Sequence, residues 1–456
     1  MAGVQIDHGW AWLVCYGAFT ALLLETGTVK ALGVLLPDLR EQFTTHTWIV
    51  GLMISLVPGF GAVTCPLAGA LSKRFSGRYT VMIFSFISSM GFIIGSLAPS
   101  VPVLLVSLVI AGFSIGAEVI VMGEMAKYFD ENYSLANAFS QSGLSVGVMI
   151  MPLLTQLLRD IYGWRGTMLI LGGINLHMII SGALLRPINQ SLSNFHDDDD
   201  DEFHIYQSTE PNNELHQTQY SQKCAGEQPK SLFENVLYYI DLKLFINSHF
   251  VSLIIYNFGN GYCLTGWVIY LVPFGLDIGL APYKATSLST FGGIGNLIGN
   301  LVFPFVNRRF SSKTILYLTT AISGLALAVN PIFELFHSYV GLMFASAVFG
   351  CGRGMAIVAL YQIVKECIED DRLTNAVMWV NVSYSLGSVA SGFLSGWAYD
   401  ATGNYTTSFC ILSAFTILTL VPLLIVDKAN RTRHSADKGN RTQYSTLKSE
   451  EPYGVD

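Results

Sequence analysis

The sequence predicts an all-α integral membrane protein with twelve transmembrane helices. Charged residues make up only 12% of the chain, about half of the ~25% that is usual in soluble proteins. Hydrophobic residues make up 51%, and the mean hydropathy is +0.47. So small a share of polar residues cannot cover a water-soluble protein of 456 residues, and we therefore expect a lipid bilayer to cover it.

Twelve apolar runs are long enough to cross the hydrocarbon core of a bilayer, which takes about 20 residues of helix. They lie at 10–35, 48–71, 79–97, 102–124, 135–158, 167–185, 246–272, 284–306, 313–331, 338–364, 375–399 and 405–426.

A polar stretch at 187–231 separates the sixth run from the seventh and carries an acidic run from Asp197 to Glu202. Its composition cannot support a packed core, so we expect a disordered cytoplasmic loop. The chain then divides into a first half (1–186), this loop, a second half (232–426) and a polar cytoplasmic tail (427–456). Apolar residues spaced as on one helix face between Leu232 and Leu244 predict an amphipathic helix on the membrane surface at the start of the second half.

Lysine and arginine predict the orientation, because they are concentrated in cytoplasmic segments. With both termini in the cytoplasm, 19 of the 25 basic residues fall in inner segments and four in outer loops. The remaining two, Lys30 and Arg353, fall inside predicted spans.

Charge and cysteine content exclude several classes of protein. A net charge of −7 does not attract nucleic acid, which is also negatively charged. The seven cysteines are scattered and odd in number, so they predict neither a disulfide framework nor a metal site. No nucleophile–base pair or phosphate-binding loop is present, so we expect neither an enzyme nor a cofactor.

The two halves of the chain resemble each other at four matching places. The basic turn from Lys73 to Arg78 follows the second run, and the similar turn from Arg308 to Lys313 follows the eighth, 235 residues later. The other three matches occur in the same order at offsets of 236 to 240 residues. Two six-helix bundles related by an axis along the membrane normal would give this pattern, which is the architecture of the major facilitator superfamily.

Several motifs carry a closer resemblance. Asp7-His8-Gly9-Trp10-Ala11-Trp12 is similar to the Asp-Gly-Gly-Trp-Gly-Trp signature that opens the monocarboxylate transporter family, although His8 and Ala11 replace glycines. The segment Gly163-Trp164-Arg165-Gly166 before the sixth run also matches that family, as does Gly396-Trp397-Ala398-Tyr399-Asp400 late in the chain. The resemblance therefore covers both halves and implies that Asp7, Gly9, Trp10, Trp12 and Arg165 are signature residues.

Charged side chains inside a bilayer are costly, so they are candidates for function. Lys30 lies 23 positions after Asp7, deep in the first run. The resemblance implies that it binds the substrate, since the lysine in this part of the family's first span does so. The alternative is a lysine near the end of the span whose ammonium group reaches the membrane surface.

Three further charges lie inside predicted spans. Glu25 precedes Lys30 by five residues, and either carries a proton or hydrogen-bonds to a neighbour. Glu118 in the fourth run and Arg353 in the tenth lie at nearly equivalent positions of the repeat. They either pair across a central cavity or are satisfied separately within their own bundles. We assign Glu25 and Glu118 to proton transfer or gating and Arg353 to substrate binding.

The eighth run departs from the family pattern. Proton-coupled members resemble one another in carrying an aspartate and, four residues later, an arginine in this span, where our alignment has Gly295 and Gly299. Proton-coupled transport is therefore in doubt. Asn296 and Asn300, one turn apart, either hydrogen-bond to a substrate or hold neighbouring helices together.

Together these observations predict a secondary transporter of the plasma membrane for a small organic solute. The resemblance implies a monocarboxylate and, as in some relatives, a single-span immunoglobulin-like accessory glycoprotein. The alternatives are a proton-independent facilitator of a zwitterionic or amino-acid-like solute, and a membrane sensor that does not transport.

Overall fold

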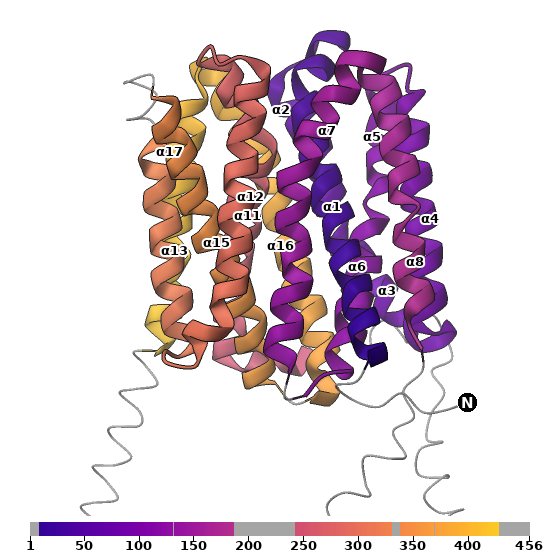
Figure 1. Cartoon of the computed structure of the whole chain (residues 1–456), viewed down its shortest axis with the longest axis vertical. Coiled ribbons are helices and arrows are strands. Elements are labelled where there is room, and N and C mark those ends of the chain that lie inside the picture. Colours follow the sequence, from indigo (N-terminus) through magenta and orange to yellow (C-terminus); the bar gives the residue numbers. More distant parts are fainter. Residues whose placement is uncertain (1–8, 131, 187–241, 331–337, 369, 428–456) are drawn as a thin grey trace, which may run out of the picture.

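The computed structural model of the chain describes residues 9–130, 132–186, 242–330, 338–368 and 370–427. Every regular element within these ranges is a helix, in agreement with the predicted all-α class. The long helices run side by side along one axis (Figure 1).

The described residues of the first half form eight helices, of which α2 and α3 together make one bent rod and α5 and α6 another. They are α1 (Gly9–Gln42), α2 (Thr47–Gly59), α3 (Gly61–Phe75), α4 (Gly77–Ser96), α5 (Val101–Ala111), α6 (Phe113–Lys127), α7 (Tyr133–Asn175) and α8 (Met178–Leu184).

The described part of the second half opens with a short 3-10 helix, η2 (Leu242–Ile246), which precedes a series of long helices. These are α11 (Ser248–Asp277), α12 (Pro282–Asn307), α13 (Ser312–Ala328), α15 (Tyr339–Cys367), α16 (Asp370–Thr402) and α17 (Tyr405–Leu418).

Eight helical stretches of the described residues are long and apolar enough to cross a membrane. The longest, Tyr133–Leu184, contains two of the predicted runs, because Gly163 has a φ of +65° and interrupts the helical backbone inside α7. Glycine adopts this left-handed conformation without the steric penalty of a Cβ atom. α11, α13 and α16 coincide with three further predicted runs but are not among the eight stretches. The number of twelve spans therefore stays a prediction.

Parts of the predicted division of the chain fall outside the description. The loop at 187–231 and the tail from residue 428 lie outside the described residues, and of the predicted surface helix only the part from Leu242 is described. The division into two bundles, a loop and a tail likewise stays a prediction.

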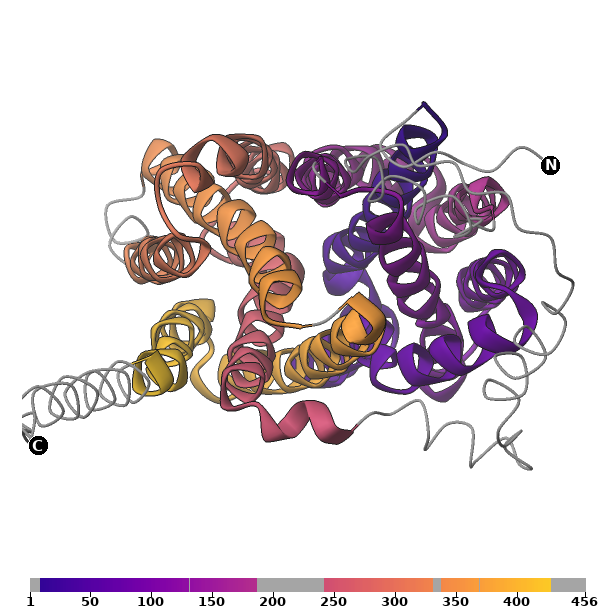
Figure 2. The ribbon, with the colours of Figure 1, turned by 90° about the horizontal axis from the view of Figure 1, so that it is seen from below.

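The helices of the first half gather on one side of the molecule and those of the second half on the other (Figure 2). Between the halves, α2 packs along α16, α7 along α12, and α1 against α11. We call the end of the molecule that holds Gly9 the near end, and the end that holds Gln42 the far end. The near end is at the bottom of Figure 1.

Two bent rods of the first half lie side by side and touch where each of them bends. The rod α2–α3 bends at Phe60, and the rod α5–α6 bends at Gly112. A Cβ atom at Gly112 would lie 2.7 Å from both the Cβ of Phe60 and the backbone oxygen of Val57, so only glycine permits this contact. Beyond the bends, α6, which carries Glu118, packs against α3.

Candidate functional site

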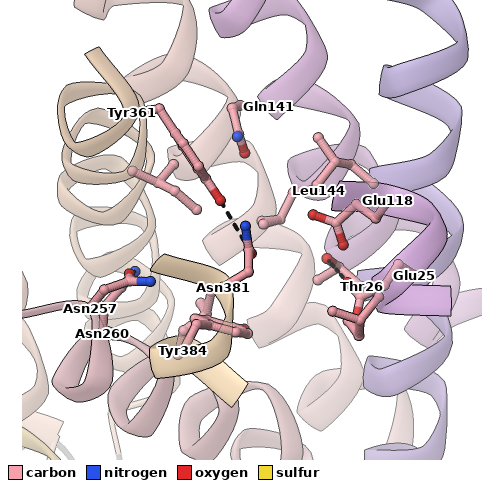
Figure 3. A pocket seen from close by; sticks show the side chains of 14 residues that line it. Glu25, Thr26, Glu118, Gln141, Leu144, Asn257, Asn260, Tyr361, Asn381 and Tyr384 are labelled. Atoms are coloured by element: carbon pink, nitrogen blue, oxygen red, sulfur yellow. Dashed lines mark hydrogen bonds between the residues drawn. The ribbon is translucent and has the colours of Figure 1, made fainter. Parts of the chain in front are cut away.

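A cavity lies between the two halves and is lined by three helices from each. The first half contributes α1, α6 and α7, and the second half contributes α11, α15 and α16. The cavity volume is about 30 Å³. Its polar lining residues are Glu25, Thr26, Glu118, Gln141, Asn257, Asn260, Tyr361, Asn381 and Tyr384 (Figure 3).

Two carboxyl groups form the polar wall on the side of the first half. Glu25 on α1 and Glu118 on α6 are each only 8% exposed. Thr26 donates a hydrogen bond of 2.8 Å to Oε2 of Glu25. Glu118 and Glu25 are close enough to interact electrostatically, and no described residue donates a hydrogen bond to Glu118 or forms an ion pair with it. The structure thus brings together two residues that the sequence predicted separately.

Amide side chains form the facing wall in the second half. Asn257 and Asn260 lie one turn apart on α11 and are hydrogen-bonded to each other, from Nδ2 of Asn260 to Oδ1 of Asn257, at 2.8 Å. Asn381 on α16 accepts a hydrogen bond of 3.4 Å from the hydroxyl group of Tyr361 on α15 (Figure 3). The two walls therefore differ in chemistry, with carboxyl groups facing neutral amides and the two phenols of Tyr361 and Tyr384.

Lys30 does not line this cavity but lies on its far side, five residues beyond Glu25 along α1. Its side chain is fully buried, at 0% exposure, which contradicts the alternative that its ammonium group reaches the membrane surface. Nζ donates a hydrogen bond of 2.7 Å to the backbone oxygen of Val268 and lies 4.8 Å from the ring centroid of Trp267. Both partners belong to α11, so Lys30 connects the two halves.

The contacts of Lys30 belong to a larger set that closes the far end. A Cβ atom at Gly33 would lie 2.8 Å from the backbone oxygen of Ile269, so α1 and α11 touch through their backbones there. Nearer the far end, the carboxylate of Asp400 on α16 accepts hydrogen bonds from the backbone N–H groups of Thr47 and Trp48, at 3.3 and 2.9 Å. The two halves are therefore in direct contact between the cavity and the far end.

The structure does not bring Arg353 and Glu118 together. Arg353 is only 2% exposed, on α15, and lies within electrostatic reach of Tyr256 and Cys263 on α11 of its own half. No ion pair between Arg353 and Glu118 occurs among the described residues of this conformation. The sequence left two interpretations open, a pair across the cavity or two charges with separate neighbours. The structure agrees with the second, because the repeat does not predict the groups that each side chain faces.

Asn296 and Asn300 hold α12 against α7 and do not line the cavity. Ser145 on α7 donates a hydrogen bond of 2.6 Å to Oδ1 of Asn296. Nδ2 of Asn300 donates to Oγ of Ser145 and to the backbone oxygen of Gln141, both at 3.0 Å. The structure therefore agrees with the interpretation that these two residues join helices.

Gly295 and Gly299 face α15 within the second half rather than the first half. A Cβ atom at Gly295 would lie 2.0 Å from the backbone oxygen of Ala347, and one at Gly299 would lie 2.2 Å from that of Cys351. A charged side chain has no room at either position. The polar residues of α12 that hydrogen-bond with the first half include Thr290, Asn296 and Asn300, which are all neutral, and the two asparagines each follow one of these glycines by one position.

The signature residues act as structural contacts at the two ends of the molecule. At the near end, Nε1 of Trp10 donates to the backbone oxygen of Leu184 at 3.1 Å, and the Arg186 guanidinium lies 3.4 Å from the centroid of the Trp10 ring. Trp12 packs edge-on against Phe129. At the far end, Arg165 donates to the backbone oxygen of Ser96 at 3.1 Å.

Of the other two signature residues, only Gly9 is described. Gly9 begins α1, and no atom lies within 4 Å of a Cβ built on it. Asp7 lies outside the described residues.

The amide wall was not predicted from the sequence. Asn257, Asn260 and Asn381 are uncharged, whereas the predicted functional residues inside spans are mainly charged. The signal was present as two asparagines three residues apart in an apolar run, since a buried amide also needs hydrogen-bonding partners. The position of the amide wall opposite Glu25 and Glu118 was not predictable in this way, because it depends on how the two halves, which are distant in sequence, pack together.

Comparison with known proteins agrees with this arrangement. The chain matches the family described as Major Facilitator Superfamily over residues 18–391 and 322–451. The chain belongs to the major facilitator superfamily. It is also similar to proteins named monocarboxylate transporters, which confirms the resemblance predicted from its motifs.

Three of these relatives show the extent of the similarity. Monocarboxylate transporter 12 of Mus musculus is 25% identical over 443 residues, covering 94% of this chain and 88% of the relative. Monocarboxylate transporter 6 of Mus musculus is 26% identical over 432 residues, covering 91% and 86%. Monocarboxylate transporter 13 of Rattus norvegicus is 25% identical over 417 residues, covering 90% and 87%. This member of the superfamily is therefore a multi-pass membrane protein homologous to transporters along nearly its whole length.

Proposed function

We propose that this protein is a secondary transporter that moves a small organic solute bearing one carboxylate across the plasma membrane. Its twelve spans would form two six-helix bundles, which rock against each other and expose the cavity to one side of the membrane at a time. Both termini, and hence the near end, would be cytoplasmic, as the distribution of lysine and arginine predicts.

The observation that carries this proposal is the position of the cavity. Its lining comes equally from the two halves, so any rotation of one half against the other changes the surroundings of a bound solute. The contacts of Lys30, Gly33 and Asp400 close the route from the cavity to the far end. This conformation corresponds to the outward-closed stage of an alternating-access cycle.

Two cations are available for the carboxylate of the substrate. In the present conformation the ammonium group of Lys30 is held by the backbone oxygen of Val268 on the other half. Opening of the far end would separate these partners and release a desolvated cation beside the cavity. A carboxylate is a stronger partner than a carbonyl for such a cation, because both groups carry a full charge. Arg353 would act as a second anion-binding group in the opposite half.

The names of the relatives support a monocarboxylate as the substrate class. We further propose a single-span immunoglobulin-like glycoprotein as an accessory partner, as the resemblance implies. A sensor without transport is a weaker candidate, since the cavity and the closing contacts resemble the parts of a working cycle.

Uptake by proteoliposomes tests the proposal. The purified full chain, reconstituted into liposomes, should take up radiolabelled monocarboxylates or their amino and guanidino derivatives faster than protein-free liposomes. Uptake should saturate with concentration and should be inhibited by excess unlabelled solute. Saturable binding to the purified protein without any uptake would contradict transport and favour the sensor.

A further inference from the structure

The cavity contains an excess of hydrogen-bond acceptors and no basic side chain. None of its fourteen lining residues is lysine, arginine or histidine, whereas Glu25 and Glu118 both face it. Glu118 receives no hydrogen bond from any described residue, so its carboxyl oxygens remain available to a ligand. A bare organic anion would meet two acidic groups here and no positive charge to offset them.

The amide wall adds to this excess, because one N–H of each of its three amide groups is already engaged within the protein. Nδ2 of Asn257 donates to the backbone oxygen of Val380 at 2.7 Å. A carbonyl can only accept, so this contact fixes the amide of Asn257 with its oxygen toward Asn260. Nδ2 of Asn260 donates to that oxygen at 2.8 Å.

The consequence concerns the remaining oxygen of Asn260. Its Oδ1 is buried and has no hydrogen-bonding partner in the described part of the chain, and the residue is only 3% exposed. Asn381 is oriented in the same way, since its Nδ2 donates to the backbone oxygen of Val377 at 3.0 Å. An unpaired buried acceptor costs free energy and therefore indicates a missing donor.

We propose that this cavity binds the positively charged nitrogen of the substrate, a primary ammonium or a guanidinium group that donates several N–H bonds at once. Glu25 and Glu118 would hold the charge from one side, and Oδ1 of Asn260 would accept a further bond from the other. One part of this inference rests on the proposed transport function: that the same solute carries both this nitrogen and the carboxylate that Lys30 binds.

Other features of the lining favour an organic cation over a metal ion. Five aliphatic side chains line the cavity, and they suit the carbon skeleton next to a charged nitrogen: Leu22, Ile115, Leu144, Leu264 and Ile357. Tyr361 and Tyr384 add aromatic rings, which attract organic cations through their faces. The volume of about 30 Å³ admits an ammonium head group, so the rest of the solute requires the cavity to widen.

The first test uses the wild-type protein with probes of matched skeleton. γ-Aminobutyrate and 3-guanidinopropionate carry both charges, butyrate carries only the carboxylate, and n-butylamine carries only the cation. We expect the two zwitterions to raise the thermal unfolding temperature of the purified protein and to compete for uptake at concentrations at least about tenfold lower than butyrate does. n-Butylamine should also stabilise the protein, although it lacks the carboxylate.

The second test uses isosteric variants of the cavity. In Glu118→Gln and Glu25→Gln, stabilisation by n-butylamine and the preference for the zwitterions should both be lost. The matched control is Glu124→Gln, since Glu124 lies on the same helix as Glu118 but pairs with Lys127 at 2.8 Å, outside the cavity. The control should keep both properties.

The outcomes separate this inference from the proposed function. Uptake of butyrate equal to that of γ-aminobutyrate, unchanged in both glutamine variants, would overturn the cation site and leave transport intact. Stabilisation by sodium ions in place of the amines would also overturn it. Binding of n-butylamine that depends on Glu118, with no uptake of any probe, would support the cation site and contradict transport.

Discussion

Lys30 is a fully buried cation whose ammonium group is held by backbone carbonyl oxygens of the opposite half. Carbonyl oxygens carry only partial charges, so these contacts offset only part of the free energy that it costs to bury the ammonium group. The same residue can therefore serve two states of the protein, as a contact that closes the far end and as a ligand for a carboxylate when that end is open.

Replacement of this side chain tests the second role. Lys30→Ala should lower uptake at least about tenfold while surface abundance stays normal, because a charge-assisted hydrogen bond contributes roughly 1.5–3 kcal/mol. Uptake in expressing cells, normalised by surface biotinylation, measures this. Lys127→Ala is the control, since Lys127 forms a near-end ion pair with Glu124. Transport by Lys30→Ala at the wild-type rate would mean that Lys30 only joins the halves.

The glycines of α12 provide a second prediction for single residues. Gly295→Ala should lower the thermal unfolding temperature of the purified protein, because the added Cβ would lie 2.0 Å from the backbone oxygen of Ala347. Overpacking of this kind costs about 1–3 kcal/mol. Gly173→Ala is the matched control, since nothing lies within 4 Å of its added Cβ and alanine favours a helix. Equal unfolding temperatures for the two variants would contradict the close packing of α12 on α15.

At the scale of helices, the first turn of α2 depends on the other half of the molecule. Its N-cap residue, His46, provides no side-chain hydrogen bond, and the N–H groups of Thr47 and Trp48 instead donate to Asp400 on α16. A carboxylate at a helix N-terminus is also favoured by the helix dipole. Under the proposed alternating-access cycle these partners would separate when the far end opens, so the cap would stabilise only the closed conformation.

Removal of this cap should shift the equilibrium between conformations. An N-cap contributes about 1 kcal/mol, so Asp400→Ala should raise the population open at the far end about fivefold. The readout is labelling of Ser55→Cys, a buried position of α2, by a membrane-impermeant maleimide in a background with the exposed Cys410 replaced.

The internal repeat supplies the control for this measurement. Asp160 occupies the position equivalent to Asp400, and its carboxylate accepts a hydrogen bond of 2.9 Å from Gln156 on its own helix. Asp160→Ala should therefore leave the labelling rate unchanged. Labelling that is no faster in Asp400→Ala than in Asp160→Ala would show that the cap does not hold the far end closed.

For the whole molecule, the fold class and the order of the helices were predicted mainly from the composition and the internal repeat. Long apolar runs specify helices and their approximate ends, because a bilayer requires internally satisfied backbone groups. Lys30, Glu25 and Glu118 were found for a related reason, since a buried charge is conspicuous in an apolar run. The partners of these residues were not predictable, because Val268 and Asn260 approach them only through the packing of one half on the other. Arg353 illustrates the same limit. Its position in the repeat suggested a partner in the first half, whereas in the structure it lies near groups of its own half.

The last prediction concerns the energy source of the cycle. Coupling to one proton would turn each pH unit of an inward gradient into up to about tenfold accumulation of the solute. The residues of α12 that hydrogen-bond with α7 include Thr290, Asn296 and Asn300, which are neutral and cannot carry a proton between the two faces. Glu25 and Glu118 are the carboxyl groups of the cavity, and we assign them to the cation of the substrate.

Steady-state accumulation of labelled γ-aminobutyrate in proteoliposomes should therefore be the same with and without a one-unit inward proton gradient. A protonophore added to collapse the gradient is the control and should change nothing. Accumulation that rises about tenfold with the gradient would contradict the prediction. Loss of this gradient dependence in Glu118→Gln or Glu25→Gln, with uptake in the absence of a gradient retained, would then identify that carboxyl group as the proton carrier, because an amide of the same shape preserves the packing of the cavity but cannot exchange a proton during the cycle.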